Sequence, residues 1–292
     1  MIIKKDITFQ GLMEITRKNF FLKPKTSKFK KIDSSFINFF KKKIKKKTIF
    51  LNFQDKENIK IPLIKMGKAS SFGLFIFLEF VVFYLYYVFK DRHKRAADIG
   101  GNLGLHSIIM SKLGYTVDVY EPDPNHFKLL KKNVKNNNCK NINLINKAVS
   151  NKNSKMKFVQ VLNNTYANHI IGEKDNAHGK LKIINVKALD ISKIINKYSF
   201  LKIDAEGSEG KIICRLSKSQ LKKVDIICEI SGKNNARAIF SHCKRNSIYI
   251  FSQKIKWKIV KKIDDIPEHH SDGLIFISGK KKIFDFMYGT RN

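Results

Sequence analysis

Short apolar runs alternate with amphipathic stretches from about residue 94 to the C-terminus. The apolar runs predict strands, and they cover 94–99, 115–120, 142–149, 156–161, 180–189, 199–204 and 224–230. The amphipathic stretches predict helices over 105–113, 125–137, 209–216 and 234–245. Near the end, SIYIF, KWKIV and GLIFIS predict short antiparallel strands. We therefore expect an α/β domain with a doubly wound, mostly parallel, Rossmann-like sheet and a C-terminal antiparallel hairpin.

The first 70 residues lack this regular pattern and contain the basic run KKKIKKK, Lys41 to Lys47. We expect residues 1–70 to form a basic, partly helical accessory region, followed by one domain over 71–292 with its motif core at 94–231. At the start of this domain lies FGLFIFLEFVVFYLYYVF, 18 residues with a single charge, Glu79. A membrane-spanning helix needs roughly 20 apolar residues and is penalised by a central carboxylate. The run therefore predicts a helix buried against the sheet, with contact at a membrane interface left as an alternative.

The chain of 292 residues carries 58 basic and 24 acidic side chains, a net charge of +34. Such a charge is typical of proteins with an anionic partner, but it also fits a lysine-rich composition with few arginines. Nucleic acid is therefore not the expected partner, although contact with it or with an anionic membrane surface stays open. Four cysteines without C-x-x-C spacing, and a start without an apolar leader, predict free thiols in a cytoplasmic protein.

Three polar loops follow predicted strands and fall where an open parallel sheet binds its ligand, beyond the carboxyl ends of the strands. They are DIGGNLG from Asp98, EPDP from Glu121 and DAEGSEG from Asp204. Glu121 is placed where a carboxylate accepts hydrogen bonds from the hydroxyls of a ribose. The glycine loop lacks the G-x-G-x-x-G spacing that suits a pyrophosphate, which disfavours an NAD-dependent oxidoreductase. S-adenosyl-L-methionine fits better, because it joins an adenosine to an amino acid and has no phosphate.

The segments DIGGNLG, VYEPDPNHFKLLKKNVKNN, INKAVSN, LKIDAEGSEGKII and DIICEIS resemble, in order and spacing, the FkbM family of class I methyltransferases. The resemblance covers about 98–231 and implies S-adenosyl-L-methionine as the cofactor. It also implies O-methylation, with a sugar or glycan, a lipid-linked molecule or another small molecule as the acceptor. The chain departs from the family over 163–179, where acceptor contacts would differ. The cofactor contacts that the resemblance implies come from Asp98, Gly100, Asn102, Gly104, Glu121, Asp123, Ala148 and Asp204.

An alcohol acceptor must lose a proton during methyl transfer, so a base near the reactive methyl would help. The candidates are Asp204, Glu206 and His169, and the sequence shows no metal site. Methylation of a base amine is disfavoured because the chain has no Pro-Pro pair, whereas RNA ribose methylation stays open. A non-catalytic module that binds polyanions or membranes is a further alternative, and its binding would depend steeply on salt. The sequence names neither the acceptor nor the oligomeric state.

Overall fold

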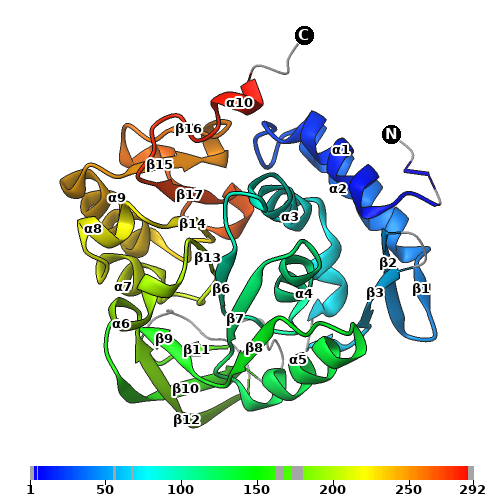
Figure 1. Ribbon diagram of the computed structural model, residues 1–292, viewed down its shortest axis with the longest axis horizontal. Helices are drawn as coiled ribbons and strands as arrows, with labels where there is room; N and C mark the ends of the chain where they lie inside the picture. The colour runs from blue at the N-terminus through cyan, green and yellow to red at the C-terminus, as the bar shows by residue number, and fades with distance from the viewer. Residues whose placement is uncertain are drawn as a thin grey trace.

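An eight-stranded sheet forms the centre of the molecule (Figure 1). The structure, a computed structural model, describes residues 3–4, 6–54, 57–66, 69–161, 168–172 and 180–288. The strand order is β16-β15-β17-β14-β13-β6-β7-β8. These strands are β6 (Arg95–Ile99), β7 (Thr116–Tyr120), β8 (Ile142–Ile145), β13 (Phe200–Ile203), β14 (Asp225–Cys228), β15 (Tyr249–Ser252), β16 (Lys258–Ile259) and β17 (Ile275–Ser278).

The five strands from β14 to β8 run parallel to one another, as the sequence predicts. At the other edge β17 pairs antiparallel with β14 and with β15, and β15 pairs antiparallel with β16. The expected α/β architecture with antiparallel C-terminal strands is therefore confirmed. Because the parallel strands end on one side of the sheet, the loops after β6, β7, β13 and β14 meet at a common edge.

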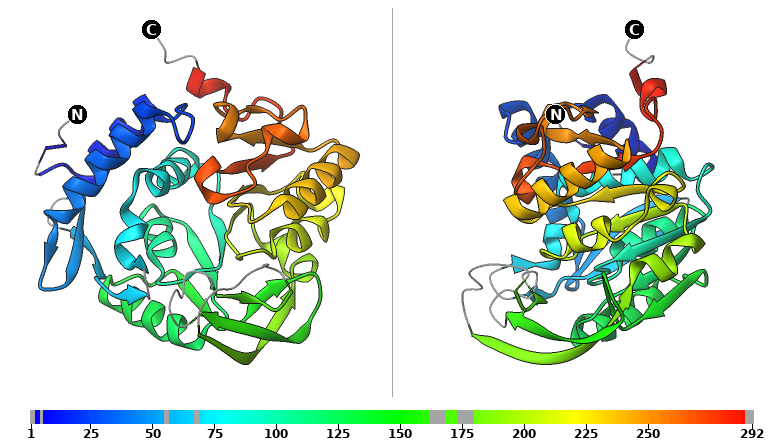
Figure 2. Two further views of the ribbon diagram at one scale, coloured as in Figure 1. Left: turned by 180° about the vertical axis from the view of Figure 1, so that it is seen from behind. Right: turned by 90° about the vertical axis from the view of Figure 1, so that its left-hand side faces the viewer.

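Helices cover both faces of this sheet, and alternate residues of each strand point to opposite faces. One hydrophobic cluster includes Ala96, Phe200 and Ile227, and the helices on that side are α1 (Phe9–Asn19), α2 (Ser27–Lys41), α3 (Phe77–Phe89), α4 (Leu105–Lys112) and α5 (Pro124–Asn136). The other cluster includes Ala97 and Leu201, and on its side lie α6 (Ile191–Ile194), α7 (Glu209–Cys214), α8 (Lys218–Leu221) and α9 (Lys233–Asn246). The short α10 (Asp285–Tyr288) follows β17. Figure 2 shows this layering from two further sides.

Short 3-10 turns complete the helical structure. They are η1 (Ser71–Phe75), η3 (Ile195–Lys197), η4 (Gln253–Ile255), η5 (Ile263–Asp265) and η6 (His270–Asp272).

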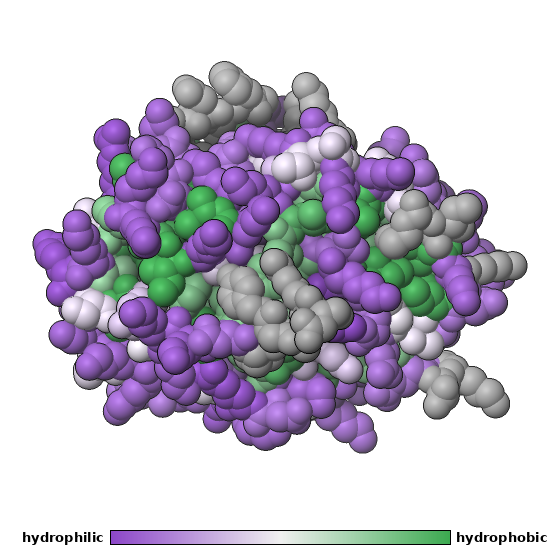
Figure 3. Space-filling view, turned by 90° about the horizontal axis from the view of Figure 1, so that it is seen from above, coloured by the Kyte–Doolittle hydropathy of each residue, from purple (hydrophilic) through white to green (hydrophobic). Residues whose placement is uncertain are grey.

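Most side chains on the face drawn in Figure 3 are hydrophilic, with hydrophobic ones visible in recesses between them. Among the lysines and arginines that the structure describes, only Lys202 is buried, so the basic excess is carried on the surface.

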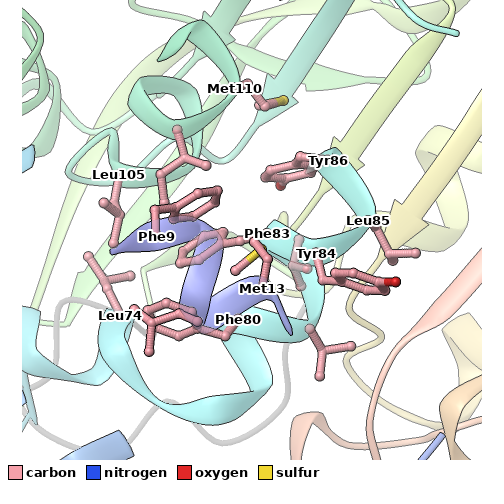
Figure 4. Packing of buried hydrophobic residues seen from close by; sticks show 14 of the residues in the cluster. Phe9, Met13, Leu74, Phe80, Phe83, Tyr84, Leu85, Tyr86, Leu105 and Met110 are labelled. Atoms are coloured by element: carbon pink, nitrogen blue, oxygen red, sulfur yellow. The ribbon is translucent and has the colours of Figure 1, made fainter. Parts of the chain in front are cut away.

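The apolar run around Glu79 forms η1 and α3, and α3 is buried on several sides (Figure 4). Its ring contacts reach α2, where Phe36 and Phe80 have centroids 4.8 Å apart. They also reach the sheet, where Tyr86 and Phe200 are 5.8 Å apart. The prediction of a helix packed against the sheet is confirmed, because α3 fills the space between the N-terminal helices and the central strands. None of the helices among the described residues is long and apolar enough to cross a membrane.

The N-terminal region contains strands that the sequence pattern did not predict. A three-stranded antiparallel sheet has the order β1-β2-β3, and β4 pairs antiparallel with β5. In β2 the inward residues Ile49, Leu51 and Phe53 alternate with half-buried ones. One outward residue, Phe50, is also apolar, which hides the alternation in the sequence. The strands are β1 (Ile44–Lys45), β2 (Thr48–Gln54), β3 (Glu57–Pro62), β4 (Lys65–Met66) and β5 (Ala69–Ser70).

A four-stranded sheet of order β11-β10-β12-β9 projects at the bottom of Figure 1. It corrects the expectation of one continuous strand over 142–149, because the chain leaves the central sheet after β8 and enters the small sheet at β9. The side chain of Asn146 marks the break, since its amide donates to the carbonyl of Glu121 at 2.8 Å. The strands are β9 (Ala148–Ser150), β10 (Ser154–Val161), β11 (His169–Ile170) and β12 (Leu181–Asp190).

Candidate active site

A cavity of about 1570 Å³ lies where the loops after β6, β7, β13 and β14 meet. Its walls include Gly100, Glu121, Asp204 and Glu229, one residue from each of these four loops. The small sheet closes another side, and the segment from Ser70 to Glu79 closes a third. The volume exceeds the few hundred to about 1,000 Å³ typical of a single small-molecule site, so two ligands can fit together.

The glycine loop after β6 is held against β7 by its backbone. The N–H groups of Gly100 and Gly101 both donate to the carbonyl of Tyr120 at 3.0 Å. Gly100 has a φ of +82°, and a Cβ there would lie 1.8 Å from the carbonyl oxygen of Asp204, so a larger residue cannot fit. Of the three residues of this loop that are predicted to contact the cofactor, Gly100 and Asn102 line the cavity, whereas Gly104 turns the chain into α4 beneath Leu130.

Glu121 joins the loops after β6 and β7. One carboxylate oxygen accepts the N–H of Asn102 at 2.7 Å, and the other accepts the N–H of Asp123 at 2.8 Å. The side chain is buried, and this burial raises the pKa of Glu121 to about 8. Glu121 also lines the cavity, so its carboxyl group can form a hydrogen bond with a hydroxyl group of a ligand there.

Asp123 holds structure around the site through four hydrogen bonds. It caps α5 by accepting the N–H groups of Asn125 at 2.7 Å and His126 at 3.2 Å. Its other oxygen accepts the side-chain amides of Gln160 and Asn168, each at 2.8 Å. The carboxylate thus ties the tip of β7 to β10 and to the residue before β11. A direct contact of Asp123 with the cofactor stays a prediction.

A buried lysine, Lys202, connects the loop after β6 with the loop after β13. Its Nζ donates to the carbonyl of Gly100 at 3.1 Å and lies 3.4 Å from carboxylate oxygens of both Asp98 and Asp204. Burial alone would lower the pKa of Lys202, but Asp98 and Asp204 raise it above its ordinary value. Asp98 is fully buried and also accepts the hydroxyl of Ser107 at 2.6 Å. Asp98 therefore orients Lys202. The sequence pattern did not predict that this lysine links the two loops.

Acidic residues after β13 and β14 form one end of the cavity. Asp204, Glu206 and Glu229 line it, which brings two of the three predicted catalytic residues into the same space. Glu209 supports the loop from below, because its carboxylate accepts the N–H groups of Ala205 at 3.1 Å and Gly207 at 2.9 Å. Burial raises the pKa of Glu209 to about 7.

The sequence from residue 98 to residue 269 matches the family described as the methyltransferase FkbM domain. The chain belongs to the FkbM methyltransferase family. This confirms the predicted family, the α/β fold class and S-adenosyl-L-methionine as the cofactor. Among proteins of curated function, none matches this FkbM chain.

Several solved structures are similar to this FkbM methyltransferase at low identity. One is an S-adenosylmethionine-dependent methyltransferase from Agrobacterium tumefaciens, with 10% identity, a TM-score of 0.42, and coverage of 82% of this chain and 72% of that chain. Another is an O-methyltransferase from Bacillus cereus, with 10% identity, a TM-score of 0.35, and coverage of 67% and 78%. A precorrin-6y C5,15-methyltransferase from Geobacter metallireducens has 11% identity, a TM-score of 0.36, and coverage of 67% and 85%.

The small sheet of the FkbM protein supplies the wall opposite the glycine loop. Ala148, which was predicted to flank the adenine, lies on this wall, as do Phe158 and Ile170. His169 is buried and pairs with Val159 across β10 and β11, whereas its neighbours on the chain line the cavity. Its catalytic role stays a prediction. Of the variable segment at 163–179, only 168–172 falls within the described residues.

A second feature that sequence reasoning missed comes from α3, outside the matched FkbM segment. Glu79 lines the cavity, and one of its oxygens lies 3.1 Å from Nε2 of His106. Nδ1 of the same ring lies 2.9 Å from the hydroxyl of Tyr86. The only signal in the sequence is that Glu79 is the single charge in an apolar run. Within the described residues no group of three or more His, Cys, Asp or Glu side chains is placed to hold a metal ion.

Proposed function

We propose that this protein transfers a methyl group to a hydroxyl of a sugar, glycan, lipid-linked or other small-molecule acceptor. One observation carries the proposal. A single cavity joins Glu121, at the tip of β7, to the carboxylates of Asp204 and Glu206 after β13. A ribose-binding group and candidate proton acceptors therefore face the same space, and its volume of about 1570 Å³ leaves room for an acceptor beside the cofactor.

The residues around the cavity fit S-adenosyl-L-methionine. Glu121 can form hydrogen bonds with the hydroxyls of a ribose, and Ala148 offers a small apolar surface for an adenine. The hydroxyl of Ser208 is buried on the cavity wall and has no hydrogen-bond partner among the described residues, so it can bond a ligand. When bound, this cofactor supplies a methyl group that is activated by a positively charged sulfur.

The acceptor side is built around Asp204 in this proposal. Its side chain is 36% exposed, and one oxygen lies 3.4 Å from Nζ of Lys202. The lysine can orient the carboxyl group of Asp204, which is the candidate to accept the proton of an acceptor hydroxyl. Glu206 is the second candidate because it lines the same wall. Phe158 and Ile170 offer an apolar surface on which the carbon face of a sugar or a lipid tail could pack.

The first test is calorimetric titration with S-adenosylhomocysteine beside NAD. We expect micromolar binding of the homocysteine compound, no binding of NAD, and loss of binding in Glu121→Ala. Glu14→Ala is the matched control, because Glu14 is an exposed glutamate of α1 that pairs with Arg17. Folded wild-type protein that fails to bind S-adenosylhomocysteine would refute the proposal.

The second test identifies the acceptor class. Protein, methyl-labelled cofactor and separate pools of glycosides, lipid-linked sugars and RNA are incubated, and the labelled product is analysed by mass spectrometry. A methyl ether on a glycoside or lipid-linked sugar supports the proposal. Label only in RNA would replace it with ribose methylation. Asp204→Asn should then lower kcat with little change in the affinity for S-adenosylhomocysteine.

A further inference from the structure

A basic groove of about 420 Å³ lies between the N-terminal helices and the turn before β16. It shares no lining residue with the active-site cavity. Its walls include two half-buried apolar side chains, Phe21 and Leu22. None of the described residues that line it is acidic, and four of them are exposed lysines: Lys18, Lys23, Lys28 and Lys256. The groove therefore offers positive charge beside apolar surface, which suits an anion that carries an apolar part.

Two segments that are far apart in the sequence build this groove. Lys23 lies on the connection between α1 and α2, and Lys28 lies in the first turn of α2, where the positive end of the helix dipole adds to the charge. Lys256 is held beside them because its neighbour, the buried Trp257, donates from Nε1 to the carbonyl of Phe20 at 3.1 Å. The rings of Phe20 and Trp257 are also stacked, with centroids 5.1 Å apart. Packing thus holds like charges together, and an anion between them would relieve their repulsion.

The basic surface continues from the groove along α2 to β1 and the turn after it. The apolar face of α2 is buried, whereas all of its lysines are exposed. Among the ion pairs between described residues, none includes a lysine of α2. These helices and strands lie along one outer edge of the molecule (Figure 2). Further exposed lysines around β1 are Lys42, Lys45, Lys46 and Lys47. The groove and the exposed lysines of α2 and of the residues around β1 are called the basic face below.

The few acidic residues in this part of the sequence already have partners within the protein. From residue 8 to residue 54 the chain has 13 basic and two acidic side chains. Glu14 pairs with Arg17 at 2.9 Å, and Asp33 accepts the N–H of Phe77 at 2.8 Å. The basic face therefore has a positive potential that an external anion would offset.

The side chains of the basic face favour a membrane over a nucleic acid. Twelve of the 13 basic residues are lysines, which act as point charges, and the single arginine, Arg17, is paired with Glu14. The four phenylalanines of α2 are buried, so this helix offers no ring on which a base could stack. A membrane requires neither planar hydrogen bonding nor stacking, because lysines are attracted to its layer of phosphates by charge alone.

We propose that the basic face docks this protein on an anionic lipid membrane, with the phosphate of a lipid headgroup in the groove. The lysines of α2 and those around β1 supply the attraction to the charged surface. In the groove the lysines hold the phosphate, and Phe21 and Leu22 contact the apolar part of the lipid next to it. The contact is peripheral, because the apolar face of α2 is already buried in the protein. This docking goes beyond the proposed methyl transfer and does not depend on it.

The test is co-sedimentation with vesicles of one quarter phosphatidylglycerol and three quarters phosphatidylcholine, beside vesicles of phosphatidylcholine alone. The wild-type protein should bind the anionic vesicles and leave the neutral ones. Raising NaCl from about 0.1 M to about 0.5 M should weaken the binding at least about tenfold, because salt screens the charges. The groove variant combines Lys18→Gln, Lys23→Gln and Lys28→Gln. It should bind about a hundredfold more weakly, at about fivefold for each lysine near an anionic surface.

The matched control removes the same charge from exposed positions at and after α8, by Lys218→Gln, Lys222→Gln and Lys223→Gln together. Its binding should change by less than about threefold. An equal loss in both triple variants would show that the charge of the whole chain holds the membrane, and it would overturn the basic face as the cause. If circular dichroism shows that the groove variant is unfolded, a second variant of the basic face takes its place, with Lys31→Gln, Lys41→Gln and Lys45→Gln.

The remaining outcomes separate a membrane from other partners. Folded wild-type protein that does not bind anionic vesicles, or that binds neutral ones equally well, would overturn the inference and leave the methyltransferase function standing. Single-stranded RNA is titrated in parallel at the same phosphate concentration. Tighter binding of RNA than of vesicles, lost in the groove variant, would replace the membrane with a nucleic acid as the partner of this face.

Discussion

Replacing Glu121 with glutamine removes a carboxyl group whose pKa burial raises from 4.5 to about 8. The folded protein therefore holds the carboxyl proton of Glu121 more tightly than the unfolded chain does. The stability that it contributes is complete below about pH 4.5 and is lost as the pH rises through 8. Between about pH 5.5 and 8.5, the wild-type protein should lose ~3 kcal/mol of unfolding free energy that the variant keeps, because glutamine does not titrate. Glu121 accepts two backbone N–H groups, and the NH₂ of the glutamine would face one of them donor to donor. At either pH this lost hydrogen bond lowers the unfolding free energy by ~1–3 kcal/mol.

Urea unfolding at both pH values measures this difference, with the fluorescence of the buried Trp257 as the signal. Other buried acids such as Glu209 titrate in both proteins, so their contributions cancel when the two pH dependences are subtracted. The constant cost of the amide cancels in the same way. Parallel pH profiles, within ~0.5 kcal/mol, would show that Glu121 is ionised in the folded protein and that its two backbone hydrogen bonds outweigh burial.

Two further substitutions test the packing around the site. Gly100→Ala should destabilise the protein by at least ~2 kcal/mol more than Gly172→Ala, measured by urea unfolding, because both glycines have φ near +80° but only the Cβ at 100 meets backbone within 4 Å. Equal costs would mean that the loop moves away from Asp204 freely. Phe80→Ala should lower the unfolding free energy by ~3–5 kcal/mol, because its ring is fully buried among other aromatic rings, whereas Ile183→Ala, at a side chain 59% exposed, should change it by less than ~0.5 kcal/mol. A small effect at Phe80 would contradict the packing of α3 in the core.

The elements that the sequence predicted well are those whose signal is local. The strands and helices from residue 94 onward follow short-range periodicity, and Glu121 was predictable because the end of a parallel strand fixes where a side chain emerges. The N-terminal sheet was missed because apolar residues such as Phe50 also occupy its outward positions. The break between β8 and β9 was missed because the hydrogen bond that Asn146 forms there with Glu121 joins two loops, and a local pattern does not report it.

The missed site residues depend on contacts between distant parts of the chain. Glu79 becomes a cavity residue only because α3 packs beside α4 and His106 meets it there. Lys202 lies in an otherwise apolar strand. Its contact with Asp98 exists only because β13 and β6 are neighbours in the sheet, which the local sequence around Lys202 does not show. Periodicity reports which face of an element is buried, but it does not report which buried polar groups meet across the fold.

The hydrophobic cluster on the α3 side of the sheet runs from Ile3 to Met287 and thus extends beyond both ends of the family match at 98–269. A fragment cut at the family boundaries would leave Phe200 without the ring of Tyr86 in α3 that packs against it, and it would lack β17 altogether. The segment that the family match covers is therefore smaller than the part of the chain that shares this hydrophobic core. We therefore expect that fusion proteins and truncations need the N-terminal helices as well, since residues of α1 and α2 are part of this core.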